Sequence, residues 1–280
     1  MSPQPTSLSL GWQTELIFAR FDGEVRQLDD CLVIRSPANP LFYWGNCIVL
    51  PQPPEDAALA HWLDRFETEV GRHTRESGHV AIGFDADGPH APLPAWRGAG
   101  FEIFRTAQLS LEAGAEQPPA RALPSGLRFA VLDLGRAAEL AAAVNRQCAS
   151  NDMGFEPRHY RRHRERQMRR YAAMQAAGLG AWFGIWHGEE LVADCGLFRD
   201  GPLGRFQHVG THPAWRRRGL CTALIQGATR HGLEALGLRS LVMCADPEDV
   251  AIGIYESLGY RRSGEYWGAQ RRPSRDRRPD

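Results

Sequence analysis

The sequence contains no lysine, because all 33 of its positively charged residues are arginine. Schiff-base enzymes, pyridoxal-phosphate enzymes and P-loop nucleotide-binding proteins each need a lysine amine at a defined position. These three classes are therefore excluded before any motif is considered.

Long apolar runs and metal-binding cysteine pairs are also missing. No uninterrupted apolar stretch approaches the roughly 18 residues of a membrane span, and no basic and apolar leader stands at the start. The six cysteines form no C-x-x-C pair and have no histidine at metal-ligand spacing. We therefore expect a cytoplasmic protein with reduced thiols, no membrane contact and no metal.

The 280 residues are 43% hydrophobic and 24% charged, which is typical of an ordinary globular protein of one large or two average domains. The net charge of zero hides an asymmetry. Residues 1–120 carry 8 arginines and 16 acidic residues, whereas residues 121–280 carry 25 arginines and 17 acidic residues. The second part is therefore better suited to binding an anionic ligand. Five of its arginines, however, lie in the last ten residues.

Residues 112–126 accumulate proline, alanine and glycine without hydrophobic periodicity, which indicates a domain boundary. We expect an N-terminal domain at 1–115, a linker at 116–126, a C-terminal domain at 127–268 and a disordered tail at 269–280.

The C-terminal part alternates between strand and helix patterns. Strands are expected from 127, at 181–188, 190–198, 205–212 and 240–246, and helices at 137–147, 156–178, 219–236 and 251–260, before a final strand pair. The N-terminal part repeats this order more faintly, with strands at 46–50 and 79–85 around a helix at 55–70. We interpret the chain as an α/β protein with a degenerate internal repeat; the alternative is that any two β-α-β units look alike.

The segment from Val209 to Cys221 lies between a predicted strand and a predicted helix and has the features of an anion site. A turn that opens a helix presents several unpaired N–H groups, and the helix dipole adds positive charge. Gly219 lets a ligand approach the backbone, and three arginines precede it. A pyrophosphate fits this pattern.

This segment resembles the acyl-CoA signature of the GNAT superfamily of N-acetyltransferases, Q/R-x-x-G-x-G/A. Arg216 and Gly219 match it, while Cys221 stands where the family usually has Gly or Ala. Residues 251–260, AIGIYESLGY, resemble the family's second motif, A-x-x-x-Y-x-x-x-G-F, although Glu248 stands where the family often has Asn. The resemblance covers residues 127–268 and implies two GNAT-like domains with a mixed sheet, the C-terminal one binding acyl-CoA.

The resemblance further implies direct transfer of an acetyl group from acetyl-CoA to an amine acceptor. It places pantetheine on the open backbone of Val209, Gly210 and Thr211, next to a strand bulge. It assigns Tyr255 as the acid that protonates the leaving thiolate; the alternative is a core aromatic. It places the pyrophosphate at the turn and first helical residues, Arg216, Arg217, Arg218, Gly219, Leu220, Cys221 and Thr222.

The sequence does not identify the residue that acts as general base. The strand at 205–212 has no carboxylate, which leaves Gln207, His208, Asp194 on the preceding strand, or a water chain. His208 is equally consistent with an ordinary surface or core histidine. A noncatalytic acyl-CoA-binding or regulatory module is therefore the alternative function.

Two further features have competing interpretations. Seven arginines within residues 158–170 are compatible with nucleic-acid binding, but their helical spacing favours a solvated basic face, and we do not expect nucleic acid as a partner. In the N-terminal domain, the prolines of residues 51–54 remove N–H donors where a pyrophosphate turn would need them, so no acyl-CoA is expected there. Aromatic residues at 42–44 and Asn46 either line an acceptor pocket or form a buried cluster. The sequence identifies neither the acceptor nor an oligomeric state.

Overall fold

A computed structural model describes residues 8–85 and 92–273. The chain divides into two compact units, residues 1–108 with 263–280 (unit 1) and residues 109–262 (unit 2). The chain leaves unit 1 within strand β5 (Glu102–Glu112) and returns to it within strand β11 (Arg261–Arg271).

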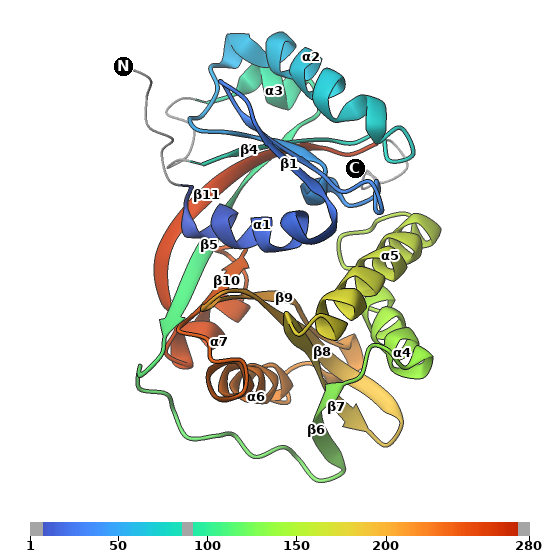
Figure 1. The fold of residues 1–280 in the computed structure, drawn as a ribbon, viewed down its shortest axis with the longest axis vertical. Helices are drawn as coiled ribbons and strands as arrows, with labels where there is room; N and C mark the ends of the chain where they lie inside the picture. The colour runs from blue at the N-terminus through green and yellow to red at the C-terminus, as the bar shows by residue number, and fades with distance from the viewer. Residues whose placement is uncertain (1–7, 86–91, 274–280) are drawn as a thin grey trace. The chain divides into compact units, whose positions relative to one another are not determined.

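Unit 1 contains a mixed sheet with helices on both faces (Figure 1). Its strand order is β1 (Glu24–Gln27), β2 (Leu32–Arg35), β3 (Cys47–Leu50), β4 (Val80–Phe84), β11 and β5. The β3–β4 pair is parallel, and the β1–β2, β2–β3 and β4–β11 pairs are antiparallel. The helices are α1 (Leu10–Asp22), α2 (Leu59–Glu69) and α3 (Pro94–Gly98), with short 3-10 turns at Tyr43–Gly45, Asp56–Ala58 and Gly71–His73.

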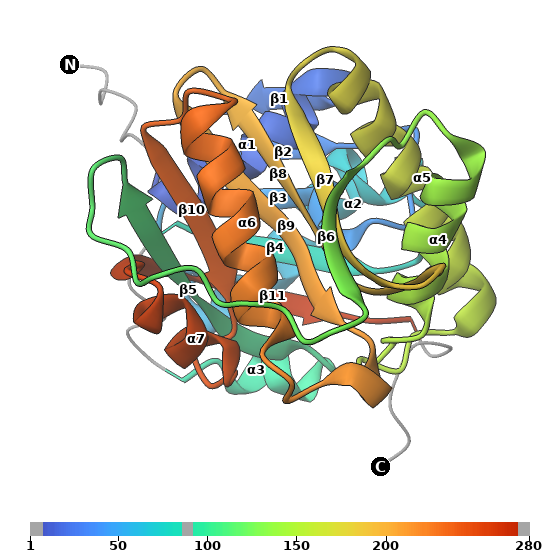
Figure 2. The ribbon, with the colours of Figure 1, turned by 90° about the horizontal axis from the view of Figure 1, so that it is seen from below.

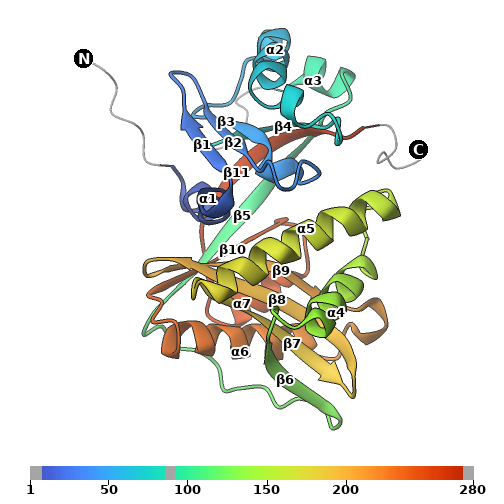
Figure 3. The same cartoon turned by 45° about the vertical axis from the view of Figure 1, so that its right-hand side comes forward.

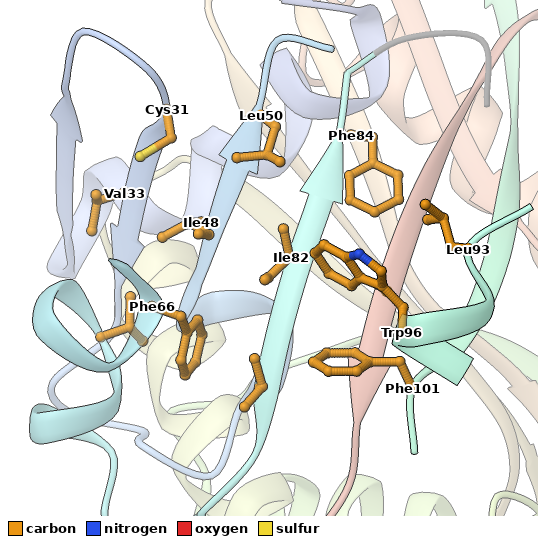
Figure 4. Packing of buried hydrophobic residues seen from close by; sticks show 13 residues of the cluster. Cys31, Val33, Ile48, Leu50, Phe66, Ile82, Phe84, Leu93, Trp96 and Phe101 are labelled. Atoms are coloured by element: carbon orange, nitrogen blue, oxygen red, sulfur yellow. The ribbon is translucent and has the colours of Figure 1, made fainter. Parts of the chain in front are cut away.

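The two faces of this sheet carry separate hydrophobic clusters. On one face, Phe66 of α2 and Trp96 of α3 pack with sheet residues that include Ile48 and Ile82 (Figure 4). On the other face, Trp12 and Leu16 of α1 pack against alternate residues of the same strands, including Ile34 and Val49. Both faces are therefore covered, which explains why β3 and β4 read as continuous apolar runs.

The aromatic run of the N-terminal domain packs inside unit 1. The Tyr43 ring stacks on His79 with centroids 4.3 Å apart, and the Trp44 indole N–H donates to Gln270 Oε1 at 3.0 Å. The Asn46 side chain is 2% exposed and donates to the carbonyls of Asn39 and Phe42. These contacts are those of a buried structural cluster.

The strands of unit 2 have the order, from one edge, β6 (Leu127–Leu132), β7 (Gly180–His187), β8 (Glu190–Asp200), β9 (Leu203–Thr211) and β10 (Ser240–Ala245), followed by the end of β5. The β9–β10 pair is parallel, and the other pairs from β6 to β9 are antiparallel. Figures 2 and 3 show α4 (Ala137–Cys148) and α5 (Pro157–Ala176) on one face and α6 (Leu220–Glu234) on the other. A 3-10 turn (Pro213–Trp215) precedes α6, and α7 (Ala251–Ser257) follows β10.

The end of the chain differs from the sequence-based expectation. The expected final strand pair is a single strand, β11, whose residues Trp267 to Arg271 pair with Phe84 to Val80 of β4. Residues 263–268 therefore belong to unit 1, and the start of the expected tail is ordered, because Ala269 is fully buried within the unit 1 core. Residues 274–280 lie outside the described part of the chain.

The basic helix α5 also differs in part from its expected form. Helical spacing predicts a stripe of Tyr160, Arg164, Met168, Tyr171 and Met174, of which Tyr160 is half-buried and the other four are buried. Arg170 lies outside this stripe and is buried as well, at 5% exposure. The arginines are therefore not all on a solvated face. Within residues 8–85 and 92–273, no helix combines the length and apolarity of a membrane span.

Candidate active site

A bulge interrupts the pairing of β9 with β8. Gln207 lies opposite Gly196 and Gly210 lies opposite Asp194, so two residues of β9, His208 and Val209, stand against one residue of β8. His208 takes the left-handed backbone region with φ 48°, which is rare for a residue with a side chain. Such a bulge bends the strand and redirects its side chains.

Beyond this bulge β9 is open on its other side. The parallel register with β10 runs from Leu203 to Arg205 and reaches no further along the described strand. The last part of β9, which holds Val209, Gly210 and Thr211, therefore presents backbone N–H and C=O groups on an unpaired edge. One of these backbone groups already has a hydrogen-bond partner within the chain, because the Thr211 carbonyl accepts from Arg216 Nε at 3.3 Å.

The open edge leads to a turn that begins α6. Arg217 and Gly219 both have positive φ, 61° and 77°, and Gly219 is the N-cap residue of α6. No side chain caps this helix, and the amides of its first turn, from Leu220 to Thr222, lack intrahelical acceptors. These amides and the helix dipole make the turn suited to an anion.

The three arginines of the turn have different surroundings. Arg216 Nη2 lies 2.5 Å from Asp152 Oδ2, and the Arg218 guanidinium lies over the Trp215 ring at 4.7 Å. Arg217 is exposed. Two of the three expected cations thus already have partners within unit 2.

The structure adds a fourth arginine that sequence reasoning missed. A Cβ built on Gly219 would lie 2.4 Å from Arg121 Nε, so the Arg121 side chain lies directly over the turn. The Arg121 amide donates to Gln226 Oε1 of α6 at 2.8 Å, and Gln226 Nε2 donates to the carbonyls of Pro118 and Pro119. These hydrogen bonds therefore hold part of the expected linker against α6. No sequence motif signals this contact, because it depends on the path of a segment rich in proline and alanine.

Tyr255 of α7 lies close to the same region. It is 5% exposed, and burial raises its pKa well above the ordinary value, with further contributions from Cys221, Asp249 and Cys195. Cys221 belongs to the first turn of α6, and Cys195 faces the bulge of β9. The groups that act on the pKa of Tyr255 thus include one in the first turn of α6 and one on β8 opposite the bulge.

The thiol of Cys221 is not activated. Burial, followed by the charge of Asp249, raises its pKa to about 11. A thiol with this pKa is protonated at neutral pH and is a poor nucleophile.

The three side chains considered as a base differ in their surroundings. Asp194 is fully buried, pairs with Arg146, and accepts from Gln147 and Trp182, each at 3.0 Å. Gln207 accepts from the Tyr171 hydroxyl at 3.1 Å and has no basic atom. His208 Nε2 is buried and has no hydrogen-bond partner within the described residues.

His208 is also the group held in its neutral form. Burial lowers its pKa well below the ordinary value, and the charges of Arg164 and Arg146 lower it further. Its imidazole is therefore unprotonated at neutral pH.

Comparison with known structures shows the fold of the whole chain. A conserved protein of unknown function from Staphylococcus epidermidis aligns with a TM-score of 0.68 at 16% identity, covering 90% of this chain and 95% of that one. A GCN5-related N-acetyltransferase from Kribbella flavida aligns with a TM-score of 0.55 at 17% identity, covering 92% and 95%. A tandem GNAT protein from the clavulanic acid biosynthesis pathway aligns at 0.54 and 13% identity, covering 97% and 96%.

The sequence itself matches a family model over part of unit 2. Residues 146–260 match the model of the acetyltransferase (GNAT) family, a range that includes the open strand, the turn before α6 and Tyr255. The structural neighbours at these identities show the fold, which includes the tandem arrangement. The chain therefore has a tandem GNAT-like fold, in which residues 146–260 match the model of the acetyltransferase (GNAT) family.

Proposed function

We propose that the protein is an acetyl-CoA-dependent N-acetyltransferase whose active site lies in unit 2. One observation carries this proposal: the open edge of β9 leads directly to an uncapped helix N-terminus with two positive-φ residues. An elongated ligand with a polar arm and a pyrophosphate matches this sequence of binding groups. Family membership supports acyl transfer in general.

The residues present fit acetyl-CoA. Val209, Gly210 and Thr211 would bind the pantetheine arm through their backbone, and the amides from Arg217 to Thr222 would bind the pyrophosphate. Arg121 lies over Gly219, next to those amides, and would add a charge-assisted hydrogen bond to a phosphate. A cation at the positive end of a helix is unfavourable alone, so an anion bound between Arg121 and the helix improves both interactions.

The proposed reaction is a direct transfer. The acceptor nitrogen attacks the thioester carbonyl, so an N–C bond forms and the C–S bond breaks. Tyr255 would donate its hydroxyl proton to the leaving thiolate, and its hydroxyl has no hydrogen-bond partner elsewhere within the described residues. A covalent intermediate on Cys221 is not part of this scheme, because that thiol stays protonated.

His208 is our choice for the group that receives the acceptor's proton. An alkyl ammonium has a pKa near 10 and cannot attack until it loses a proton. Among the three side chains considered, Asp194 is occupied by an ion pair and Gln207 is not basic, whereas His208 has an unpartnered Nε2. Because burial lowers the pKa of His208, it would accept the proton as the free amine attacks and not from the ammonium. Its position in the bulge places it beside the backbone proposed to bind pantetheine.

Calorimetry of acetyl-CoA binding tests the proposed site. We expect one acetyl-CoA per chain, and we expect Gly219→Glu to abolish binding because a carboxylate would face the pyrophosphate. Gly201→Glu is the matched control, since Gly201 also has positive φ but lies in open space at the β8–β9 turn. A stoichiometry near two, or equal affinity in both variants, would contradict the proposal.

The second candidate is a noncatalytic acyl-CoA-binding module. It is favoured by the lack of a free carboxylate near β9, where Asp194 is already paired. Thiol release from acetyl-CoA with an amine panel separates the two. Acetyl-CoA binding without thiol release on any amine would support the module instead of the enzyme.

A further inference from the structure

Arg146 lies in the last turn of α4, and its side chain is buried against the strands of unit 2. The residue is 3% exposed, its Nε forms an ion pair with the Asp194 carboxylate of β8, and its Nη1 donates to Ser150 Oγ at 3.3 Å. A positive charge is also favourable at the C-terminal end of a helix. The Arg146 guanidinium therefore has a defined place between α4 and β8.

The carboxylate that pairs with Arg146 is itself held by its neighbours. Asp194 is fully buried, and its Oδ2 accepts from Gln147 Nε2 and from Trp182 Nε1, each at 3.0 Å. Arg164 Nε in turn donates to Gln147 Oε1 at 2.6 Å. A buried carboxylate in such a network moves only if several hydrogen bonds break together. Asp194 is therefore a fixed anchor for the Arg146 side chain.

The guanidinium of Arg146 also lies against the backbone of Gly210 on β9. A Cβ built on Gly210 would lie 2.5 Å from Arg146 Nη1, 2.7 Å from Nη2 and 3.0 Å from Cζ. The φ angle of Gly210 is not in the left-handed region, so its backbone conformation does not require glycine. The guanidinium, which occupies the space that a Cβ would need, explains why this position has no side chain.

These contacts meet at the bulge of β9. Gly210 and Asp194 lie opposite each other in the register, directly after the bulge residues His208 and Val209. Arg146 therefore contacts both members of this pair, the carboxylate of Asp194 and the backbone of Gly210. A rare conformation such as that of His208, with φ 48°, persists where the surrounding structure enforces it. The contact of Arg146 with Gly210 restrains the strand next to this residue.

From this geometry we propose that Arg146 is a positioning residue that holds the bulged end of β9, so that the unpaired backbone stays in place for the pantetheine arm of acetyl-CoA. This inference rests on the proposed acetyltransferase function. Arg146 acts through Gly210, and Asp194 acts through Arg146. When this restraint is weakened, the end of β9 shifts and its hydrogen-bonding groups no longer match the ligand. An arginine with a purely structural role would affect unfolding and leave the affinity for acetyl-CoA unchanged.

A double-mutant cycle in the full-length protein tests the contact between Arg146 and Gly210. Arg146→Lys keeps a positive charge beside Asp194 but removes the flat guanidinium from Gly210. Gly210→Ala keeps the arginine and adds a methyl group where its guanidinium lies. We expect each change to raise the Kd of acetyl-CoA, measured by calorimetry, and to lower kcat/KM by roughly tenfold to a hundredfold, as for a small misplacement of a binding group.

The double variant identifies the role. With lysine at 146 the added methyl group has room, so the double variant should bind acetyl-CoA within about threefold of Arg146→Lys alone. Arg205→Lys is the matched control, because Arg205 is 5% exposed on the same strand, in the part that pairs with β10. It should lower the melting temperature and leave the Kd of acetyl-CoA unchanged. Additive losses of affinity in the cycle, or an equal loss in Arg205→Lys, would overturn the inference.

A second variant reaches the same contact if Arg146→Lys does not fold. Asp194→Asn keeps the size of the side chain and removes the charge that anchors Arg146. It should weaken acetyl-CoA binding and be non-additive with Gly210→Ala. Wild-type affinity in Asp194→Asn, or in Gly210→Ala by itself, would overturn the positioning role.

The outcomes also separate this inference from the proposed function. Failure of the wild-type protein to bind acetyl-CoA, or binding without acetylation of any amine, contradicts the acetyltransferase. A wild-type protein that binds and transfers, combined with variants that lose only stability, leaves the acetyltransferase standing and removes the positioning role of Arg146.

Discussion

Tyr255 and Tyr260 are both buried, but their hydroxyl groups differ in hydrogen bonding. The Tyr260 hydroxyl is 2.7 Å from Thr229 Oγ1, so its hydrogen bond is used within the core. The Tyr255 hydroxyl has no such partner within the described residues, and its ring lies near the first turn of α6. Burial raises the pKa of the Tyr255 hydroxyl well above its ordinary value, so the hydroxyl is protonated at neutral pH and would be available as the proposed proton donor to the leaving thiolate.

Tyr255→Phe should therefore lower turnover without changing acetyl-CoA affinity. We expect a loss of about a hundredfold, within the range typical of a general acid. Tyr260→Phe is the matched control and should affect stability more than rate, since it removes a structural hydrogen bond. Single-turnover rates with an active amine check this. An unchanged rate in Tyr255→Phe would reassign the residue to packing.

His79 of unit 1 is a buried histidine with a structural role. Its Nδ1 lies 2.7 Å from Ser77 Oγ and its Nε2 lies 2.9 Å from the Asn46 carbonyl. The ring stacks on Tyr43 and is 2% exposed. Burial lowers the pKa of His79 from 6.5 to about 4, so the folded protein holds the neutral ring.

The stability of the protein should consequently fall in mild acid. The unfolded chain takes up a proton at His79 near pH 6.5, whereas the folded chain resists it until about pH 4. The contribution is fully present above pH 6.5 and decreases by about 3 kcal/mol as the pH falls to 4. Thermal unfolding between pH 6.5 and 5, where few carboxylates titrate, checks this. The slope should become smaller in His79→Gln but not vanish, because burial also lowers the pKa of His163 and His208. It should be unchanged in His61→Gln, and equal slopes in the two variants would contradict the assignment.

At the level of elements, the segment from Pro118 to Arg121, here called the strap, lies along α6 and is held there by hydrogen bonds. Gln226 fixes it through one accepted and two donated hydrogen bonds, and its last residue lies over the anion-binding turn. A segment that sequence composition marks as a linker thereby contributes a cation to the proposed pyrophosphate site.

Arg121→Gln should weaken acetyl-CoA binding by about threefold to tenfold, because an exposed charge-assisted contact contributes modestly. The difference from wild type should shrink as salt screens the interaction. Calorimetry at low and high ionic strength measures both effects. Arg230→Gln provides the control, since Arg230 is exposed on α6 itself. If Arg121→Gln binds as tightly as wild type at low salt, the strap has no role in binding.

The elements around the site were largely predictable from sequence, and those at the start of the chain were not. The apolar run of β10 and the stripe on α6, including Leu220 and Leu224, follow directly from periodicity and are buried as expected. In contrast, β1 is a short, mostly exposed strand that forms through pairing with β2. The burial of Arg170 was not predicted either, since helical spacing shows which face a residue occupies but not how far neighbouring elements cover that face.

For the whole molecule, the main difference from the sequence-based expectation is that the last strand, β11, belongs to unit 1. The sequence order places β11 after the other strands of unit 2, yet its residues complete the core of unit 1. Its burial alternates little between Gly268 and Gln270, and its partner β4 is distant in sequence. The local residue pattern predicts that β11 is a strand. It does not predict that β11 pairs with β4, because the two strands are far apart in the sequence.

Deleting residues 263–280 should therefore destabilise unit 1, although the deletion is at the opposite end of the chain from most of that unit. It removes the hydrogen bonds of β11 to β4, each contributing about 1 kcal/mol, and takes Ala269 and Trp267 from the core cluster. Hydrogen exchange should show loss of protection for the β4 amides from Val80 to Phe84, while the amides of β7 and β8 in unit 2 stay protected. A chain ending at Pro273 is the control and should behave as the full chain does. Unchanged protection of β4 in the shorter protein would mean that β11 is not an integral strand of unit 1.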